Sequence, residues 1–136
     1  LKQLITARKV SCTLTLEDKV HDKKESVELP RFLFVTCMSH RYEGGGFMFC
    51  PPAVDHDGVL DLCSVGNISK GLVLLALPTA FFGKHYFVKG INAHTATQMS
   101  ITASAPLWVH TDGEVTRKSR SFRVECLPGA IRMITP

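Results

Sequence analysis

The segment Gly44–Asp61, GGGFMFCPPAVDHDGVLD, combines three backbone-constrained elements in one short stretch. Its three consecutive glycines allow positive φ angles or a very close approach to another group. Pro51 and Pro52 hold an extended segment that cannot donate to a sheet. Asp57-Gly58 then gives a strong turn signal, directly before the alternating run Val59–Val65. A glycine-rich loop followed by a hairpin turn explains these features without any bound ligand.

The residues on both sides of this segment predict strands. Val10–Glu17 alternates apolar and polar residues with the period of two that is typical of a half-buried strand. Val27–Ser39 contains a continuous apolar run, which predicts a strand buried on both faces with Pro30 near its edge or its start. Val59–Val65 is a third strand. Further short strands are predicted at residues 86–89, 97–104, 107–111, 121–126 and 131–134.

One helix is predicted over residues 69–82. Asn67 or Ser69 is a suitable N-cap, and Gly83 is suitable as the first residue after the helix. Because the segment has little polar surface, at least two of its faces should be covered, by the domain itself or by another domain or a lipid. Many short strands with a single helix predict a mainly β (α+β) fold, an antiparallel two-sheet β-sandwich with one main α-helix.

Length and composition limit the functional classes. The 136 residues make one ordinary domain, and the longest apolar run, residues 71–83, is too short to cross a bilayer. The five cysteines form no CxxC pair and most lie in apolar runs, so a reducing cytoplasm is expected. A net charge of +4 is compatible with an anionic membrane surface, a nucleotide or nucleic acid, and selects none of them.

Two acidic clusters are candidate sites. Asp55, Asp57 and Asp61 surround the first turn, where carboxylates and exposed carbonyls could hold a hard cation such as Mg²⁺. In Thr111-Asp112-Gly113-Glu114, the glycine would let a tight turn present both carboxylates from one corner, although such turns are common in hairpins.

Other groupings are weaker candidates. The basic run Arg117, Lys118, Arg120 and Arg123 either attracts anionic lipid head groups or protects an exposed strand edge. A zinc site has little support, because the spacing of its candidate ligands matches no standard pattern: Cys37, His40, Cys50, His56 and Cys63.

An ordered set of motifs resembles the C-terminal domain of the diacylglycerol kinase-like lipid kinases. The set comprises Tyr42, Gly44-Gly45-Gly46-Phe47, Pro51/Pro52-Ala53, Asp57-Gly58-x-Leu60-Asp61-Leu62, Gly83-Lys84-His85, Asp112-Gly113-Glu114 and Leu127-Pro128-x-Ala130-Ile131. It covers about residues 9–136. The chain departs from many relatives where Ser39 or His40 replaces an asparagine, which puts any substrate contact of that residue in doubt.

The resemblance assigns roles to particular residues. Glu114 would be the general base that accepts the proton of the lipid hydroxyl, with Asp112 assisting through Mg²⁺ or water. Asp57 would bind a structural Mg²⁺ through its side chain, with the main-chain carbonyls of Val54 and Val59 beside it. That ion would hold the loop rather than contact ATP.

The resemblance also implies a setting for the whole chain. Residues 1–136 would be the C-terminal domain of a two-domain, ATP-dependent lipid kinase, cytoplasmic and peripheral to an anionic membrane. Its glycine-rich nucleotide-binding half is absent from this sequence, so ATP would bind mainly elsewhere and the isolated chain should be inactive. Expected partners are a lipid alcohol and ATP, with no nucleic acid, and a homodimer is left open. The alternatives are a sphingoid-type lipid as acceptor, or a non-catalytic β-sandwich that binds lipid or protein.

Overall fold

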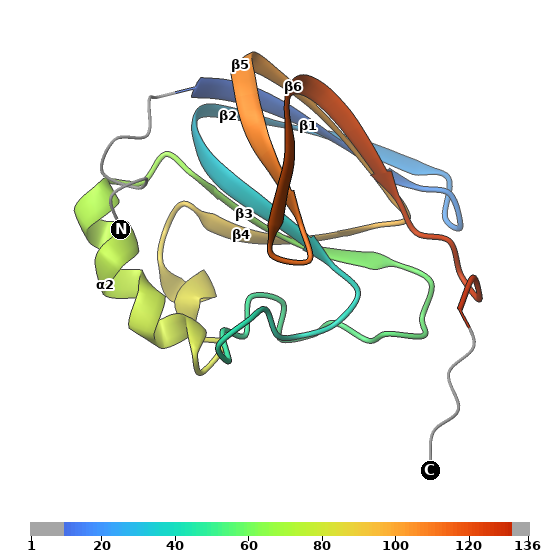
Figure 1. Ribbon diagram of the computed structural model, residues 1–136, viewed down its shortest axis with the longest axis horizontal. Coiled ribbons are helices and arrows are strands. Elements are labelled where there is room, and N and C mark those ends of the chain that lie inside the picture. Colours follow the sequence, from blue (N-terminus) through green and yellow to red (C-terminus); the bar gives the residue numbers. More distant parts are fainter. Residues whose placement is uncertain (1–9, 132–136) are drawn as a thin grey trace.

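The structure is a computed structural model that describes residues 10–131. Its strands form one six-stranded antiparallel sheet in the order β4-β3-β2-β1-β5-β6 (Figure 1). The elements are β1 Val10–Asp18, β2 Lys23–Met38, β3 Leu60–Gly66, α2 Lys70–Ala80, the 3₁₀ helix η1 His85–Phe87, β4 Ile91–Ala96, β5 Gln98–Thr111 and β6 Glu114–Glu125. The mainly β fold with one α-helix is confirmed. A second, separate sheet does not occur among the described strands.

The single sheet rolls far enough to give two facing walls. β2 pairs with β1 from Lys23 to Phe32 and with β3 from Phe32 to Met38, so it belongs to both walls. β4 pairs with β3, whereas β5 pairs with β1, and Thr97 alone separates these two strands. The Thr97 amide donates to the Glu17 carbonyl at 2.9 Å and fixes this corner. The sheet therefore bends back until β4 contacts β1, which gives the strand pattern of a sandwich without a second sheet.

Two apolar cores lie on opposite faces of β3. Leu60 and Leu62 point into the core between the walls, together with Leu14 and Ile101. The intervening side chains point into a second core, which the inner face of α2 completes: Cys63 and Val65 from β3, and Val73 and Ala76 from the helix. All seven residues of β3 are consequently buried. This arrangement explains why this strand is apolar almost throughout.

Helix α2 begins and ends as its capping residues indicate. The Ser69 hydroxyl accepts a hydrogen bond from the Leu72 amide at 3.2 Å, which confirms Ser69 as the N-cap. Gly83 has a φ of 64°. Its amide donates to Ala80 O at 3.3 Å and that of Lys84 donates to Thr79 O at 2.9 Å, the two bonds of a Schellman motif. The helix ends at Ala80, two residues before the predicted end. No described helix is both long and apolar enough to cross a bilayer.

Some predicted strands are wrong. Residues 86–89 are not a strand, because the side chains of His85 and Tyr86 both contact the Phe49 carbonyl, at 3.2 and 2.6 Å, and the chain winds into η1. The predicted strands 97–104 and 107–111 are parts of β5, with an irregularity between Thr102 and Leu107. The predicted strand 121–126 falls almost wholly within the second half of the longer β6. Strand β4 was not predicted. Of the predicted strand 131–134, only Ile131 is described, and it is not in a strand.

Candidate functional site

A two-residue turn joins β5 to β6. Thr111 pairs with Glu114, which leaves Asp112 and Gly113 as the turn residues. Both have positive φ angles, 49° and 83° respectively, as in a type I′ turn. This turn type matches the right-handed twist of its strands, so the hairpin ends at a defined corner. The tight turn predicted from Asp112-Gly113 is confirmed.

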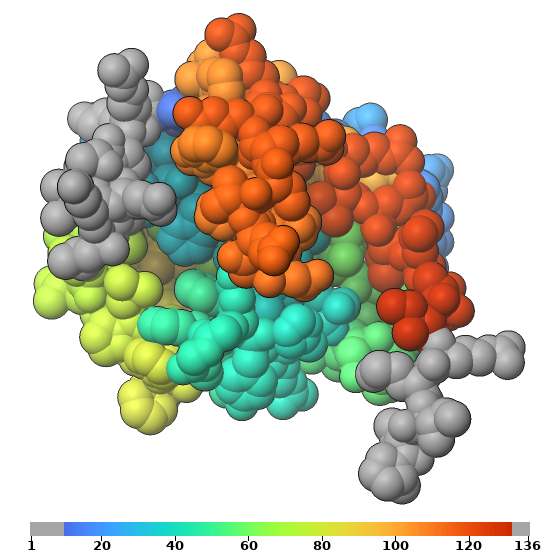
Figure 2. Space-filling view, viewed as in Figure 1, coloured from blue at the N-terminus to red at the C-terminus, as the bar shows by residue number. Residues whose placement is uncertain are grey.

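The turn presents two carboxylates to solvent. Asp112 and Glu114 are exposed, and neither side chain has a hydrogen bond or ion pair with another described residue. β5 pairs with β1 only from Gln98 to Ala103 and then continues with β6 to the turn. Figure 2 shows this hairpin, in orange, reaching over the same face of the molecule as the loop that follows β2, in cyan. An exposed carboxylate at such a corner can accept a proton or bind a cation through water.

The basic residues beside the turn lie on a sheet edge. β6 is the last strand in the sheet order. Lys118 Nζ lies 4.2 Å from the centre of the Trp108 ring, and Arg123 pairs with Glu125 at 2.7 Å. This position agrees with protection of an exposed strand edge, one of the two interpretations of the basic run. Contact with lipid head groups remains the other prediction.

The glycine-rich loop closes on itself and on the end of α2. Glu43 and Phe47 exchange two backbone hydrogen bonds, of 2.9 and 3.2 Å, across the three glycines. The Met48 amide donates to the Ala80 carbonyl at 2.9 Å. The rings of Phe47 and Phe81 lie 4.2 Å apart, centre to centre. The loop is therefore joined to the last turn of the helix.

The Asp57 turn has an all-oxygen donor set. Asp57 is exposed, and its Oδ1 accepts a hydrogen bond from the Val59 amide at 3.1 Å, which leaves the second carboxylate oxygen free. Within residues 10–131, no hydrogen bond occupies the carbonyl of Val54 or that of Val59. One carboxylate and two free carbonyls are ligands of the kind that Mg²⁺ and Ca²⁺ accept. The predicted metal ligands are thus chemically suited to such an ion.

The other two aspartates of this segment differ in their surroundings. Asp55 is exposed and bonded to His56 at 2.8 Å, and this bond lowers the pKa of its carboxyl. Asp61 is only 4% exposed, and burial raises its pKa, with a further contribution from the Asp57 carboxylate. Asp61 also lines a cleft of about 140 Å³ with Tyr86 and His94. The sequence indicated only that Asp61 lies near the turn, because its burial depends on the distant segments that cover β3.

The structure does not bring all candidate residues together. Among the described residues, Asp57, Asp112 and Glu114 do not form one group that could hold a single metal ion. Within the described residues, no three side chains of the types His, Cys, Asp or Glu converge on a metal position. Burial raises the pKa of Cys37 and that of Cys63 to about 12, so both thiols stay protonated at neutral pH. Protonated thiols are poor zinc ligands.

A rolled antiparallel sheet with one helix and an acidic hairpin turn defines a class of β-sandwich-like domains, and solved structures share this fold. A diacylglycerol kinase from Bacillus anthracis str. Sterne matches with a TM-score of 0.61 and 20% sequence identity, over 94% of this chain and 43% of that chain. A second structure, described as "A putative diacylglycerol kinase from Bacillus anthracis str. Sterne", gives a TM-score of 0.66, also at 20% identity, over 94% of this chain and 41% of that chain.

The sequence identifies the family within this class. Residues 1–135 match the family described as "YegS C-terminal NAD kinase beta sandwich-like domain", and the chain belongs to this family. The "Probable lipid kinase YegS-like" of Xanthomonas euvesicatoria pv. vesicatoria (strain 85-10) is 35% identical over 98 residues, which are 71% of this chain and 31% of the relative. The "Diacylglycerol kinase" of Mycobacterium tuberculosis (strain CDC 1551 / Oshkosh) is 26% identical over 96 residues, 71% of this chain and 30% of the relative. The chain thus spans less than a third of the length of these relatives, and the predicted resemblance to diacylglycerol kinase-like lipid kinases is confirmed.

Proposed function

We propose that this chain is the C-terminal, base-supplying domain of an ATP-dependent kinase that phosphorylates the hydroxyl of diacylglycerol or a similar lipid. The enzyme would work in the cytoplasm at the membrane surface. The observation that carries the proposal is the type I′ turn, which holds Glu114 exposed and unpaired at the end of a hairpin. The names of the relatives, lipid kinase and diacylglycerol kinase, support the substrate class.

In the proposed reaction, Glu114 accepts the proton of the lipid hydroxyl. The hydroxyl oxygen forms a bond to the γ-phosphorus of ATP, the bond between that phosphorus and the β,γ-bridging oxygen breaks, and ADP leaves. The products are the phosphorylated lipid, ADP and the proton on Glu114, which passes to water. Asp112, two residues away across the same turn, would orient water or a hydrated cation near the transferred phosphoryl group. Positioning and charge stabilisation dominate such reactions, and a carboxylate base suits them.

A turnover assay of the full-length protein tests the proposal. The protein is incubated with labelled ATP and a panel of lipid alcohols that includes diacylglycerol, a sphingoid base and a ceramide. Phosphorylation of at least one member, with loss of label transfer when the lipid is omitted, is the expected result. If the folded protein labels no lipid alcohol in the panel, the proposed function is rejected. Phosphorylation of the sphingoid base alone would identify the alternative acceptor.

We further propose that Asp57, with the carbonyls of Val54 and Val59, binds Mg²⁺ or Ca²⁺. The ion would neutralise the repulsion between the Asp57 and Asp61 carboxylates and hold the loop against β3. A ligand that binds only the folded state raises stability by about 2.7 kcal/mol when its concentration is a hundred times its Kd.

Asp57→Ala should therefore abolish the increase in melting temperature that Mg²⁺ or Ca²⁺ produces. Asp55→Ala is the matched control, since Asp55 is an exposed neighbour that pairs with His56, and it should keep the increase. Thermal unfolding in EDTA and in millimolar Mg²⁺ or Ca²⁺ measures both variants. An unchanged response in the Asp57 variant, or no response in the wild type, would exclude this site.

A further inference from the structure

The outer face of α2 carries large apolar side chains that nothing in residues 10–131 covers. Leu75 is 74% exposed and Phe82 is 75% exposed, and Leu72 is also exposed. With Pro78, these residues follow a spacing of three, three and four, so they form one stripe along the helix and the turn after it. We call Leu72, Leu75, Pro78 and Phe82 the outer stripe.

The outer stripe is not part of the packed core of the domain. The opposite side of α2 is buried against β3 through Val73, Ala76 and Ala80. The sequence predicted that at least two faces of this helix are covered. The described residues cover only one of them. An exposed contiguous apolar patch of this kind marks an interaction surface.

The end of the outer stripe is held rigidly. The Schellman bonds of Gly83 and Lys84 fix the turn that carries Phe82. The rings of Phe81 and Phe47 are in contact, tilted by 30°, and a side chain at Gly83 would come within 2.7 Å of Pro51. Phe82 is thus presented outward by a packed turn and not by a free loop.

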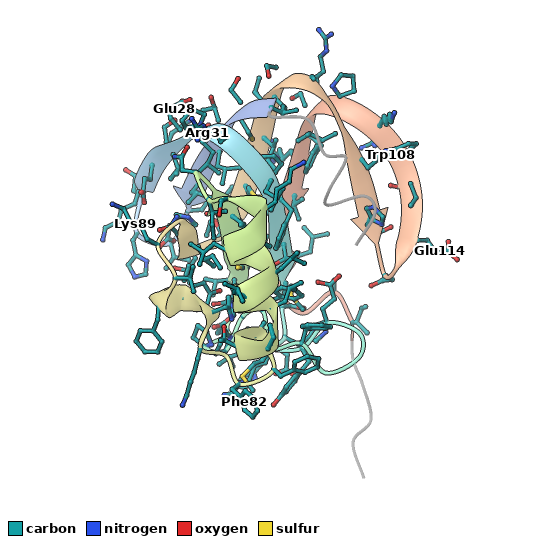
Figure 3. All side chains as sticks on the ribbon, turned by 90° about the vertical axis from the view of Figure 1, so that its left-hand side faces the viewer. Glu28, Arg31, Phe82, Lys89, Trp108 and Glu114 are labelled. Carbon is teal, nitrogen blue, oxygen red and sulfur yellow. The ribbon has the colours of Figure 1, made fainter. Side chains whose placement is uncertain are left out.

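Residues 62–111, which include α2 and η1, carry positively charged Lys side chains and no acidic ones. This part of the chain contains three lysines, Lys70, Lys84 and Lys89, and no Asp or Glu. Lys84 and Lys89 are exposed, and η1, which lies between them, contacts α2 and carries Phe87, 89% exposed. Figure 3 shows α2 toward the viewer with Phe82 at its lower end and Lys89 to one side. The loop between β2 and β3 carries Arg41 and three acidic residues, Glu43, Asp55 and Asp57, so the positive charge near the stripe comes from the lysines of residues 62–111.

We propose that the outer stripe, with Phe87, Lys84 and Lys89, docks this domain on an anionic lipid bilayer. The apolar side chains enter the boundary between head groups and acyl chains, and the lysines contact lipid phosphates. The proposal rests on the proposed function, because a kinase of lipid alcohols must take its substrate from a bilayer. It adds which face of the domain meets the lipid.

The chemistry of the stripe favours lipid over the rest of the longer protein. Contacts between domains of one chain are comparatively polar. Two hydroxyls near the stripe are engaged within the helix: that of Thr79 donates to the Ala76 carbonyl at 2.6 Å, and that of Ser69 accepts from the Leu72 amide at 3.2 Å. The side chains of the stripe itself are all apolar, and together with the nearby Lys84 and Lys89 they suit a membrane interface.

Vesicle sedimentation of the full-length protein tests the docking face. We expect binding to vesicles of phosphatidylcholine with phosphatidylglycerol, and much weaker binding to phosphatidylcholine alone. The double variant Leu75→Ser/Phe82→Ser should bind the anionic vesicles at least tenfold more weakly. The reason is that moving a large apolar side chain from water into the bilayer contributes strongly to the free energy of binding. Lys84→Gln/Lys89→Gln should weaken binding about tenfold and make it less sensitive to salt. Leu127→Ser is the control, because Leu127 is 70% exposed and lies outside this face, and its binding should not change.

Turnover separates this proposal from the proposed function. The Leu75→Ser/Phe82→Ser protein should phosphorylate a short-chain, water-soluble diacylglycerol at the wild-type rate and lose turnover on vesicles. Equal vesicle binding by this variant and the wild type overturns the docking face, as does a wild type that binds neither vesicle. Lost turnover on the soluble substrate also overturns it, because the face would then contact another part of the protein. Vesicle binding through α2 without any kinase turnover supports the docking face and rejects the proposed function.

Discussion

Replacing Glu114 by Gln in the full-length protein is expected to lower kcat by roughly two to four orders of magnitude, the usual contribution of a general base. The amide keeps the size of the side chain but cannot accept the proton of the attacking hydroxyl. The turn should be unaffected, because its geometry depends on Asp112 and Gly113 and on the pairing of Thr111 with Glu114. The measurement is steady-state transfer of labelled phosphate from ATP to the lipid alcohol.

The KM for ATP should change little in this variant, because in the proposed reaction the carboxylate acts on the acceptor and not on the nucleotide. Glu25→Gln is the matched control, since Glu25 is an exposed glutamate in β2 far along the chain from the turn, and it should retain the wild-type kcat. Circular dichroism establishes that both variants are folded. A folded Glu114→Gln protein whose kcat stays within a few-fold of the wild type would show that Glu114 is only a turn residue.

The parts of the fold that depend on neighbouring residues could be predicted from the sequence. The alternation in Val10–Glu17 predicted β1 almost to the residue, and Ser69 and Gly83 gave the ends of α2. Strand β4 was missed because only its two ends, Ile91 and Ala96, are buried, so INAHTA has no alternating apolar pattern.

Features that depend on distant contacts could not be predicted. Whether the strands make one sheet or two depends on β2, whose first half pairs with β1 and whose second half pairs with β3. The same limit applies to the site. Asp112-Gly113 indicated a tight turn directly, because turn chemistry is local. The buried carboxylate of Asp61 and the uncovered outer stripe follow from what packs on β3 and α2, and neither is visible in the spacing of residues.

The absence of a phosphate cradle leads to the second large effect. Nucleotide phosphates are commonly held by a glycine-rich loop that leads directly into a helix N-terminus. The glycine-rich loop here does not: Gly44–Gly46 lie between the mutual hydrogen bonds of Glu43 and Phe47, and the loop continues to Pro51. The one described α-helix begins at Lys70 with its Leu72 amide already bonded to Ser69. Within residues 10–131, the chain therefore offers the proposed base, Glu114, without a glycine-rich loop of this kind for the γ-phosphate.

The isolated chain of 136 residues should consequently show no kinase turnover, even with saturating ATP, Mg²⁺ and lipid. Holding the two reactants in line is a large part of the rate acceleration in phosphoryl transfer, and a proton acceptor alone does not supply it. The full-length protein assayed in parallel is the positive control, and circular dichroism of the fragment should show the mainly β content of the folded domain. Turnover by the purified fragment that disappears in its Glu114→Gln variant would mean that this domain binds ATP by itself. The division of labour proposed here, with the base in this domain and the nucleotide elsewhere, would then be wrong.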